Sequence, residues 1–166
     1  EGHRIHGYSM PLADPDRCYF DLTTVGRTRT TQLQLKYFTD EAWWQSRAVQ
    51  STQPDFSSAD RCELVIDLIE AITTLPRYDL AFGDISSNNI CAQLGSLPEV
   101  FIFDVDSIGN PAEVESQSVQ TPGWRAPEGL DAHRRTTSLT ALLVWRLFTG
   151  LPNAYPSGDI VDFLVP

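Results

Sequence analysis

One stretch of the chain, residues 58–74, shows the apolar spacing of an amphipathic helix. Its apolar side chains recur at i, i+3, i+4 and i+7, which places them on one face. The members of this face are Cys62, Val65, Ile66, Ile69 and Ile72, and it is widened by Leu64, Leu68 and Ala71. Ser57 offers an N-cap, and Leu75 with Pro76 ends the pattern. We therefore expect a helix whose apolar face is buried in the core.

A second helix is predicted over residues 136–148, which are apolar on most sides. Gly150 and then Pro152 stop it, as is typical of a helix C-terminus. Its large apolar residues are Leu139, Leu142, Leu143, Trp145, Leu147 and Phe148. A helix that is apolar on most sides belongs in a core, so we expect it at the centre of the domain.

Between these helices, residues 80–106 alternate short apolar runs with turn residues. Two runs, one starting at Ile90 and one at Val100, are separated by Gly95, Ser96 and Pro98, which favours a β-hairpin. The flanking segments 13–31 and 107–120 are polar without periodicity, and we expect loops there, the second one mobile. Residues 32–50 are expected to form a helical region that covers the core.

Three oxygen-bearing side chains stand next to these apolar runs. Asp84 follows an apolar run, Asn89 precedes the first hairpin strand, and Asp104 follows the second. A hairpin brings Asn89 and Asp104 near each other. Mg²⁺ prefers a few such oxygen ligands together with phosphate oxygens. We expect Asn89 and Asp104 to bind Mg²⁺ and Asp84 to remain available as a base, although taken singly such residues are usually turn formers.

The spacing of these residues resembles that of the protein-kinase superfamily. GDISSNN, which contains Asp84 and Asn89, is similar to the kinase catalytic loop, and FDVD, ending at Asp106, is similar to the metal-binding tripeptide. TPGWRAPE, starting at Thr121, resembles the segment that closes a kinase activation loop. The resemblance implies that Asp84 is the catalytic base, that Thr121 hydrogen-bonds to it, and that Asn89 and Asp104 bind magnesium and ATP.

The resemblance also implies a fold. It predicts a mainly α (α+β) large C-terminal lobe, in which a helical core carries a short β-hairpin with the catalytic and metal-binding loops. GYSMP near the start is similar to the hinge, so Met10 is expected to bind the adenine of ATP. Residues 1–166 are then one domain, without the small N-terminal lobe and the last helices, which we expect in a longer parent protein. Lys36 resembles the ATP-binding lysine, but too few residues separate it from Asp84, so we expect it on the surface.

Four positions depart from the kinase pattern. Phe82 stands where histidine is usual, Gly83 where arginine is usual, Asp106 where glycine is usual, and Thr136 where the core helix carries an aspartate. Without the arginine, a phosphorylated activation loop loses its usual anchor, so activity is not expected to require phosphorylation. We expect Thr136 to hydrogen-bond the backbone of the catalytic loop in place of the aspartate.

Composition excludes several classes of protein. The chain has 166 residues, 42% of them hydrophobic, which is enough for one folded domain. A net charge of −10 argues against a nucleic-acid partner, which would require a basic stripe. Three cysteines without CxxC spacing fit a reducing cytoplasm better than a disulfide framework. We also expect no membrane segment, because no apolar run approaches the ~18 residues that a spanning helix needs.

The predicted function is that of a serine/threonine protein kinase, a transferase that moves the γ-phosphoryl group of ATP to a hydroxyl of a protein substrate. The 166 residues alone are expected to be inactive, because the lobe that covers the nucleotide is missing. Two alternatives stay open. One is a small-molecule kinase of the aminoglycoside or choline type, against which TPGWRAPE counts, and the other is a pseudokinase that acts as a binding module or scaffold.

Overall fold

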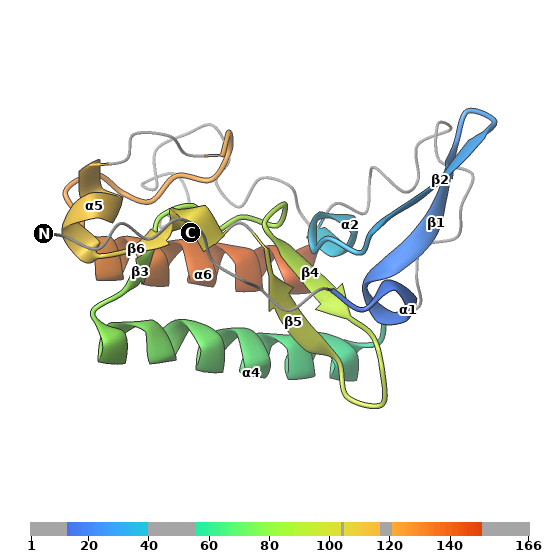
Figure 1. Cartoon of the computed structure of the whole chain (residues 1–166), viewed down its shortest axis with the longest axis horizontal. Helices are drawn as coiled ribbons and strands as arrows, with labels where there is room; N and C mark the ends of the chain where they lie inside the picture. The colour runs from blue at the N-terminus through green and yellow to red at the C-terminus, as the bar shows by residue number, and fades with distance from the viewer. Residues whose placement is uncertain (1–12, 40–55, 104, 117–120, 151–166) are drawn as a thin grey trace, which may run out of the picture.

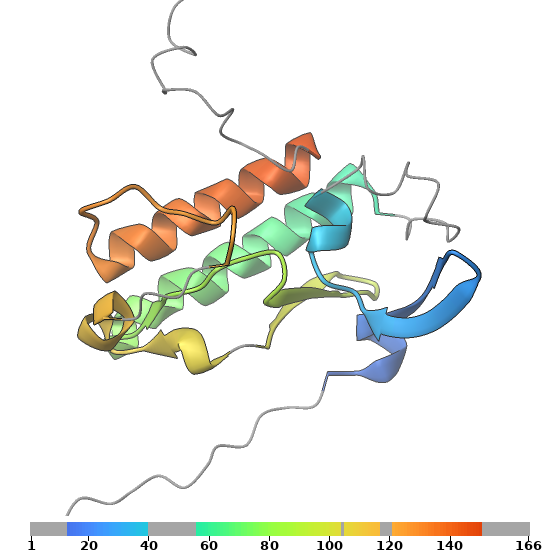
Figure 2. The ribbon, with the colours of Figure 1, turned by 90° about the horizontal axis from the view of Figure 1, so that it is seen from above.

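Two long helices, α4 (Ser58–Thr74) and α6 (Ala132–Thr149), lie side by side and antiparallel (Figures 1 and 2). The computed structural model describes residues 13–39, 56–103, 105–116 and 121–150. Ser57 and Asp60 form a capping box at the start of α4, and Gly150, with φ 65°, ends α6. Both predicted helices are therefore confirmed, with α6 beginning four residues earlier than expected.

The buried face of α4 is narrower than the predicted one. Leu64, Leu68 and Ile72 are its buried residues, all three on the predicted apolar face, whereas Ile66 and Ile69 are 55% and 44% exposed. The prediction is wrong for Ile66 and Ile69 because α4 carries apolar residues on several sides, so periodicity alone does not select the buried side. Packing against α6 and the β-hairpin selects it. On α6, likewise, Leu139 and Leu143 are buried, but Trp145 and Phe148 are each 50% exposed.

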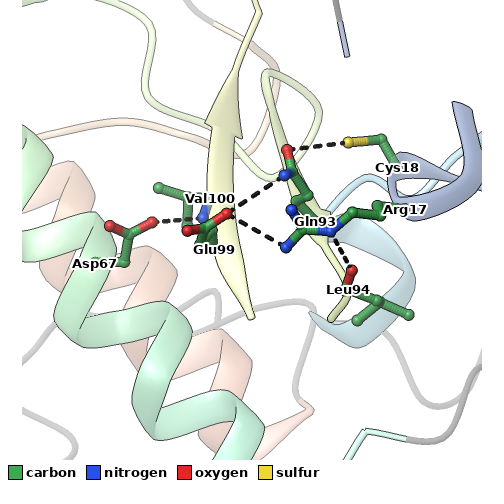
Figure 3. A network of polar contacts seen from close by, with 7 residues as sticks. All are labelled: Arg17, Cys18, Asp67, Gln93, Leu94, Glu99 and Val100. Carbon is green, nitrogen blue, oxygen red and sulfur yellow. Dashed lines mark hydrogen bonds and ion pairs between the residues drawn. The ribbon is translucent and has the colours of Figure 1, made fainter. Parts of the chain in front are cut away.

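The predicted hairpin is confirmed. Strands β4 (Ile90–Gln93) and β5 (Glu99–Ile102) pair antiparallel, with Ile90 opposite Ile102. The hairpin packs on α4, where an Asp67 carboxylate oxygen accepts a hydrogen bond from the Val100 amide at 2.6 Å (Figure 3). This contact uses a strand amide that does not pair with β4, and it joins the hairpin to the helix.

A second hairpin, β1 (Tyr19–Thr24) with β2 (Arg27–Gln32), occupies the segment predicted to be a loop. The loop prediction is wrong because β2 is largely exposed and therefore lacks the apolar alternation that signals a strand. Its stability comes from cross-strand pairs and from a tight turn at Val25 and Gly26, both with positive φ. In the region predicted to be helical, α2 (Lys36–Thr39) is a short helix, and residues 40–50 lie outside the described part.

The short helix α1 (Pro15–Cys18) ties the β1–β2 hairpin to β4 and β5 (Figure 3). The Arg17 guanidinium donates to the Leu94 carbonyl at 2.7 Å and to Glu99 at 3.3 Å. Gly95 leaves room for this arginine, because a Cβ there would lie 2.7 Å from an Arg17 nitrogen. The β1–β2 hairpin projects away from the two long helices (Figures 1 and 2). The Arg17 contacts make α1 one of the attachments of this hairpin to the rest of the fold.

Strand β3 (Ala81–Phe82) follows η1 (Leu75–Tyr78) and pairs with β6 (Ile108–Gly109). Next to β6 lie η2 (Val105–Ser107) and α5 (Pro111–Ser116). The predicted loop over 107–120 is therefore wrong as far as residue 116. Asn110 accepts a hydrogen bond from the Ala112 amide at the start of α5, and Val114 of α5 is buried. The Asn110 side chain also donates to Asp79 at 2.9 Å, and Glu115 accepts from the Ala132 amide at 3.0 Å, so polar contacts hold this segment as well.

The fold class needs correction. Helices make up 48% and strands 21% of the described residues, and the strands form three separate two-stranded sheets. The chain is therefore α+β with moderate helix content, not the predicted mainly helical lobe with a single short hairpin, and no kinase fold is shown by the described residues. The prediction failed because strand β2 is polar and largely exposed, and because β3 and β6 are only two residues long. Among the described helices, none has the length and apolar character to cross a membrane.

Candidate functional site

Asp84, two residues after β3, lies at the centre of a compact hydrogen-bond cluster. Its Oδ2 accepts from the Thr121 hydroxyl at 2.8 Å and from the Asn89 side-chain nitrogen at 3.1 Å. Its Oδ1 accepts from the Thr121 amide at 3.0 Å. Asn89 also donates to the backbone carbonyl of Asp84 at 2.8 Å. The structure thus brings together three residues that the sequence singled out, although they span 38 positions of the chain.

Thr136 of α6 holds the strand that leads to Asp84. Its hydroxyl accepts from the Phe82 amide at 3.2 Å and lies 3.1 Å from the Phe82 carbonyl. The amide and the carbonyl of Phe82 thus face Thr136 and not β6. The next amide, that of Gly83, donates to the Ser107 carbonyl at 2.8 Å. The predicted contact between Thr136 and this backbone is confirmed. Both residues are buried, so the strand end is fixed from two sides.

Segment 121–126 approaches Asp84 because it is anchored on α6. The Arg146 guanidinium stacks over the Trp124 ring at 4.1 Å and donates to the Gly123 carbonyl at 2.7 Å. The Trp124 amide in turn donates to the Thr121 carbonyl at 2.9 Å. A buried arginine on the core helix therefore supports the turn that presents Thr121 to Asp84.

The loop between Asp84 and Asn89 is held by a segment that sequence reasoning did not connect with it. The Gln34 side chain donates to the Asn88 carbonyl at 2.8 Å, and the Leu35 amide donates to the Ile90 carbonyl at 2.9 Å. The Lys36 amide donates to the Ser87 carbonyl at 3.0 Å. The one signal for this was the alternation of Leu33, Leu35 and Tyr37, which are all buried. That alternation is typical of a strand, but residues 32–50 were predicted to be helical, so this contact was not predicted.

Lys36 is half-buried and not fully on the surface as predicted. Its ammonium lies 5.2 Å from the centre of the Tyr37 ring. Burial, together with the nearby Arg29, holds the pKa of Lys36 below its ordinary value. Burial also raises the pKa of the Cys91 thiol on β4 to about 12, and the neighbouring Cys18 adds to this effect. The buried thiols of Cys91 and Cys18 therefore stay neutral.

The predicted magnesium site is described only in part. Asp104 and Met10 lie outside the described residues. Asn89 fits the role of an oxygen ligand, because both Asp84 acceptors face its nitrogen and leave its amide oxygen for another partner. The backbone adds to this fit, since the Phe103 amide donates to the Asn89 carbonyl at 3.1 Å and so places the residue before Asp104 beside Asn89. Within the described ranges, no three His, Cys, Asp or Glu side chains cluster as metal ligands.

The comparisons with known proteins add no family to this picture. No protein-family model matches the chain, and no curated protein matches it either.

Proposed function

We propose that the chain carries the catalytic centre of a serine/threonine protein kinase, which transfers the γ-phosphoryl group of ATP to a protein hydroxyl. The observation that carries the proposal is the double hydrogen bond from Thr121 to the two oxygens of Asp84, joined by Asn89. Asp84 and Asn89 belong to the motif that resembles a catalytic loop, and Thr121 begins the TPGWRAPE motif. The proposal concerns this local chemistry and is independent of the overall fold.

Asp84 acts as the base that orients the acceptor hydroxyl and accepts its proton. A carboxylate offers about four acceptor sites, two on each oxygen. The described residues use two sites on Oδ2 and one on Oδ1. Among the described residues, none uses the second site on Oδ1, which we assign to the hydroxyl of a substrate. The three donors also fix the carboxylate in one orientation, which is the main requirement for a reaction that depends on positioning.

Thr121 acts as a positioning residue between Asp84 and the substrate. Because its amide and hydroxyl both bond to the carboxylate, the backbone at Thr121 lies directly beside the base. A peptide that extends along segment 121–124 would present a side-chain hydroxyl to Asp84. The TPGWRAPE motif that begins at Thr121 favours a serine or threonine hydroxyl of a protein as the acceptor over a small molecule.

Magnesium and ATP are the implied cofactors, with Asn89 and Asp104 as metal ligands and Met10 as a contact of the adenine. Bound magnesium would neutralise charge on the phosphates. The contribution of this chain is to hold the Asn89 amide in one orientation, with its nitrogen on Asp84 and its oxygen available. A cytoplasmic setting, where ATP is abundant, belongs to the same proposal.

The test is phosphoryl transfer from labelled ATP to serine- and threonine-containing peptides, with the full-length natural protein that carries these residues. Asp84→Asn is expected to lower turnover by about 10²–10⁴-fold, the usual contribution of a general base, while ATP affinity stays nearly unchanged. The matched control is Asp79→Asn. Asp79 lies five residues earlier in the same region with φ 55°, a conformation that asparagine adopts readily, so this variant should keep wild-type turnover.

Three outcomes would overturn the proposal. If Asp84→Asn retains turnover, Asp84 is not the base. If the wild-type protein binds magnesium and ATP but transfers no phosphate to any peptide, the site belongs to a binding module. Transfer to an aminoglycoside or to choline, without transfer to peptides, would instead assign a small-molecule kinase.

A further inference from the structure

Four consecutive backbone carbonyls around Asn89 are all hydrogen-bonded. The carbonyls of residues 87, 88 and 90 accept from residues 36, 34 and 35, respectively, and the carbonyl of Asn89 accepts from Phe103. Three of the four donors thus come from one short segment, residues 34–36. Two of these three are backbone amides, which any residue except proline provides. Gln34 is the one side chain among them, so it is the donor that depends on the sequence.

The bond from Gln34 acts on the peptide plane that precedes the Cα of Asn89. A peptide unit is planar, so the Asn88 carbonyl and the Asn89 amide move together. The Asn89 amide donates to the Ser86 carbonyl at 3.1 Å, and Gln34 holds the opposite side of the same plane at 2.8 Å. The plane that follows Asn89 is held by Phe103. With both planes held, φ and ψ of Asn89 are set, and so is the direction in which its side chain leaves the backbone.

We infer that Gln34 is a positioning residue that orients the Asn89 amide toward Asp84. Asn88 is half-buried, so without Gln34 its carbonyl can turn to water, and the peptide plane before Asn89 is released. The Asn89 nitrogen then loses its alignment with the two Asp84 acceptors. The effect of Gln34 on catalysis rests on the proposed function, whereas its effect on the Asn89 amide does not.

The chain offers a matched set of variants. Gln34→Met keeps the length of the side chain but removes the donor, and Gln34→Lys keeps a donor at similar reach. Gln32→Met removes an amide two residues earlier, which donates to the Tyr19 hydroxyl at 3.4 Å and not to the loop. If Gln34→Met does not fold, Gln34→Glu replaces it, because a carboxylate beside the Asn88 carbonyl also lacks a donor.

The first readout is independent of activity. In the 166-residue chain, with asparagine labelled by ¹⁵N, the side-chain amide signal of Asn89 is assigned by its loss in Asn89→Ala. We expect Gln34→Met to shift this signal and to speed its hydrogen exchange by about 10-fold, whereas Gln34→Lys and Gln32→Met leave it close to wild type. An unchanged signal in Gln34→Met, or equal changes in the methionine and lysine variants, would overturn the inference.

The second readout is kinetic and is made on the full-length protein. We expect Gln34→Met to raise the magnesium concentration at half-maximal rate by about 10-fold, as is usual for a residue that orients a metal ligand. The rate at saturating magnesium should change much less, and Gln34→Lys should restore the wild-type requirement. If the Asn89 signal shifts as expected but the wild-type protein transfers no phosphate, the positioning role stands and the proposed function fails. An unchanged magnesium requirement in an active protein would overturn the role of Gln34 in catalysis.

Discussion

The hydroxyl of Thr136 is expected to be worth more to stability than its methyl group. Thr136→Val removes the hydroxyl at nearly constant volume, so no cavity forms. The Phe82 amide, which lies at a fully buried residue, then loses its partner at 3.2 Å. The single hydroxyl proton of Thr136 is closer to the Ala132 carbonyl, at 2.8 Å, than to the Phe82 carbonyl, at 3.1 Å, so the amide is the group that is left without a partner. A buried polar group left without a partner costs about 1–3 kcal/mol. We therefore expect a loss of about 1–3 kcal/mol in the free energy of unfolding, out of a typical total of about 5–15 kcal/mol.

Two comparison variants separate this effect from packing. Thr136→Ser keeps the hydroxyl and loses one buried methyl group, for which we expect a cost of about 1 kcal/mol. Thr137→Val changes the next residue, which is exposed and whose hydroxyl donates to the His133 carbonyl of its own helix at 3.0 Å. Its effect should stay within about 0.5 kcal/mol. The expected order of stability is therefore wild type, Thr137→Val, Thr136→Ser and last Thr136→Val.

The assay is urea unfolding of the 166-residue chain, followed by circular dichroism and by tryptophan fluorescence, with the denaturant slope required to agree among the variants. A Thr136→Val variant within about 0.5 kcal/mol of wild type, or one more stable than Thr136→Ser, would contradict the prediction. Either result would mean that water or a backbone shift satisfies Phe82 without the hydroxyl.

Two further predictions follow from the site. Because the Cys91 thiol has an ordinary pKa of 9.0 but one of about 12 in the fold, it ionises first in the unfolded chain, so stability should fall as pH rises from 9 toward 12. Between pH 8 and about pH 10.5, the free energy of unfolding of the wild type should fall by about 2 kcal/mol more than that of Cys91→Ala. Urea unfolding of both proteins at both pH values measures this difference. Equal losses in the two proteins would contradict the raised pKa of Cys91. Arg146→Met should loosen the support of Thr121 and raise hydrogen exchange at its amide at least about 10-fold, since a desolvated cation–π contact is worth about 2 kcal/mol. Arg134→Met, an exposed control, should leave that exchange unchanged.

The elements that were predicted correctly are those whose signals are local. Ser57 caps α4 within three residues of its start, and Gly150 ends α6 directly at its last turn. The turn residues between β4 and β5 act over a few positions in the same way. Such signals lie in the chain itself, so they operate before any tertiary contact forms, and they define the ends of elements but not what the elements pack against.

Three members of the site and one of its supports, Thr136, were predicted from the sequence, whereas the supports from Gln34 and Arg146 were not. The spacing of Asp84 and Asn89, together with the motif that begins at Thr121, named the residues that the structure brings together. The bonds from Gln34 to residue 88 and from Arg146 to Gly123 join segments 54 and 23 residues apart, and no pattern in the sequence links them.

By itself, therefore, the sequence determined the two long helices, the β4–β5 hairpin and the three residues that meet at Asp84. The tertiary structure decided which face of α4 is buried, that the polar segment from Tyr19 to Gln32 forms a hairpin, and that residues 34–36 hold the loop before Asn89. The physical reason is the same in each case. A helix cap or a turn depends on neighbouring residues, whereas burial and the choice of a partner for each backbone carbonyl depend on surfaces that exist only once distant segments have packed together.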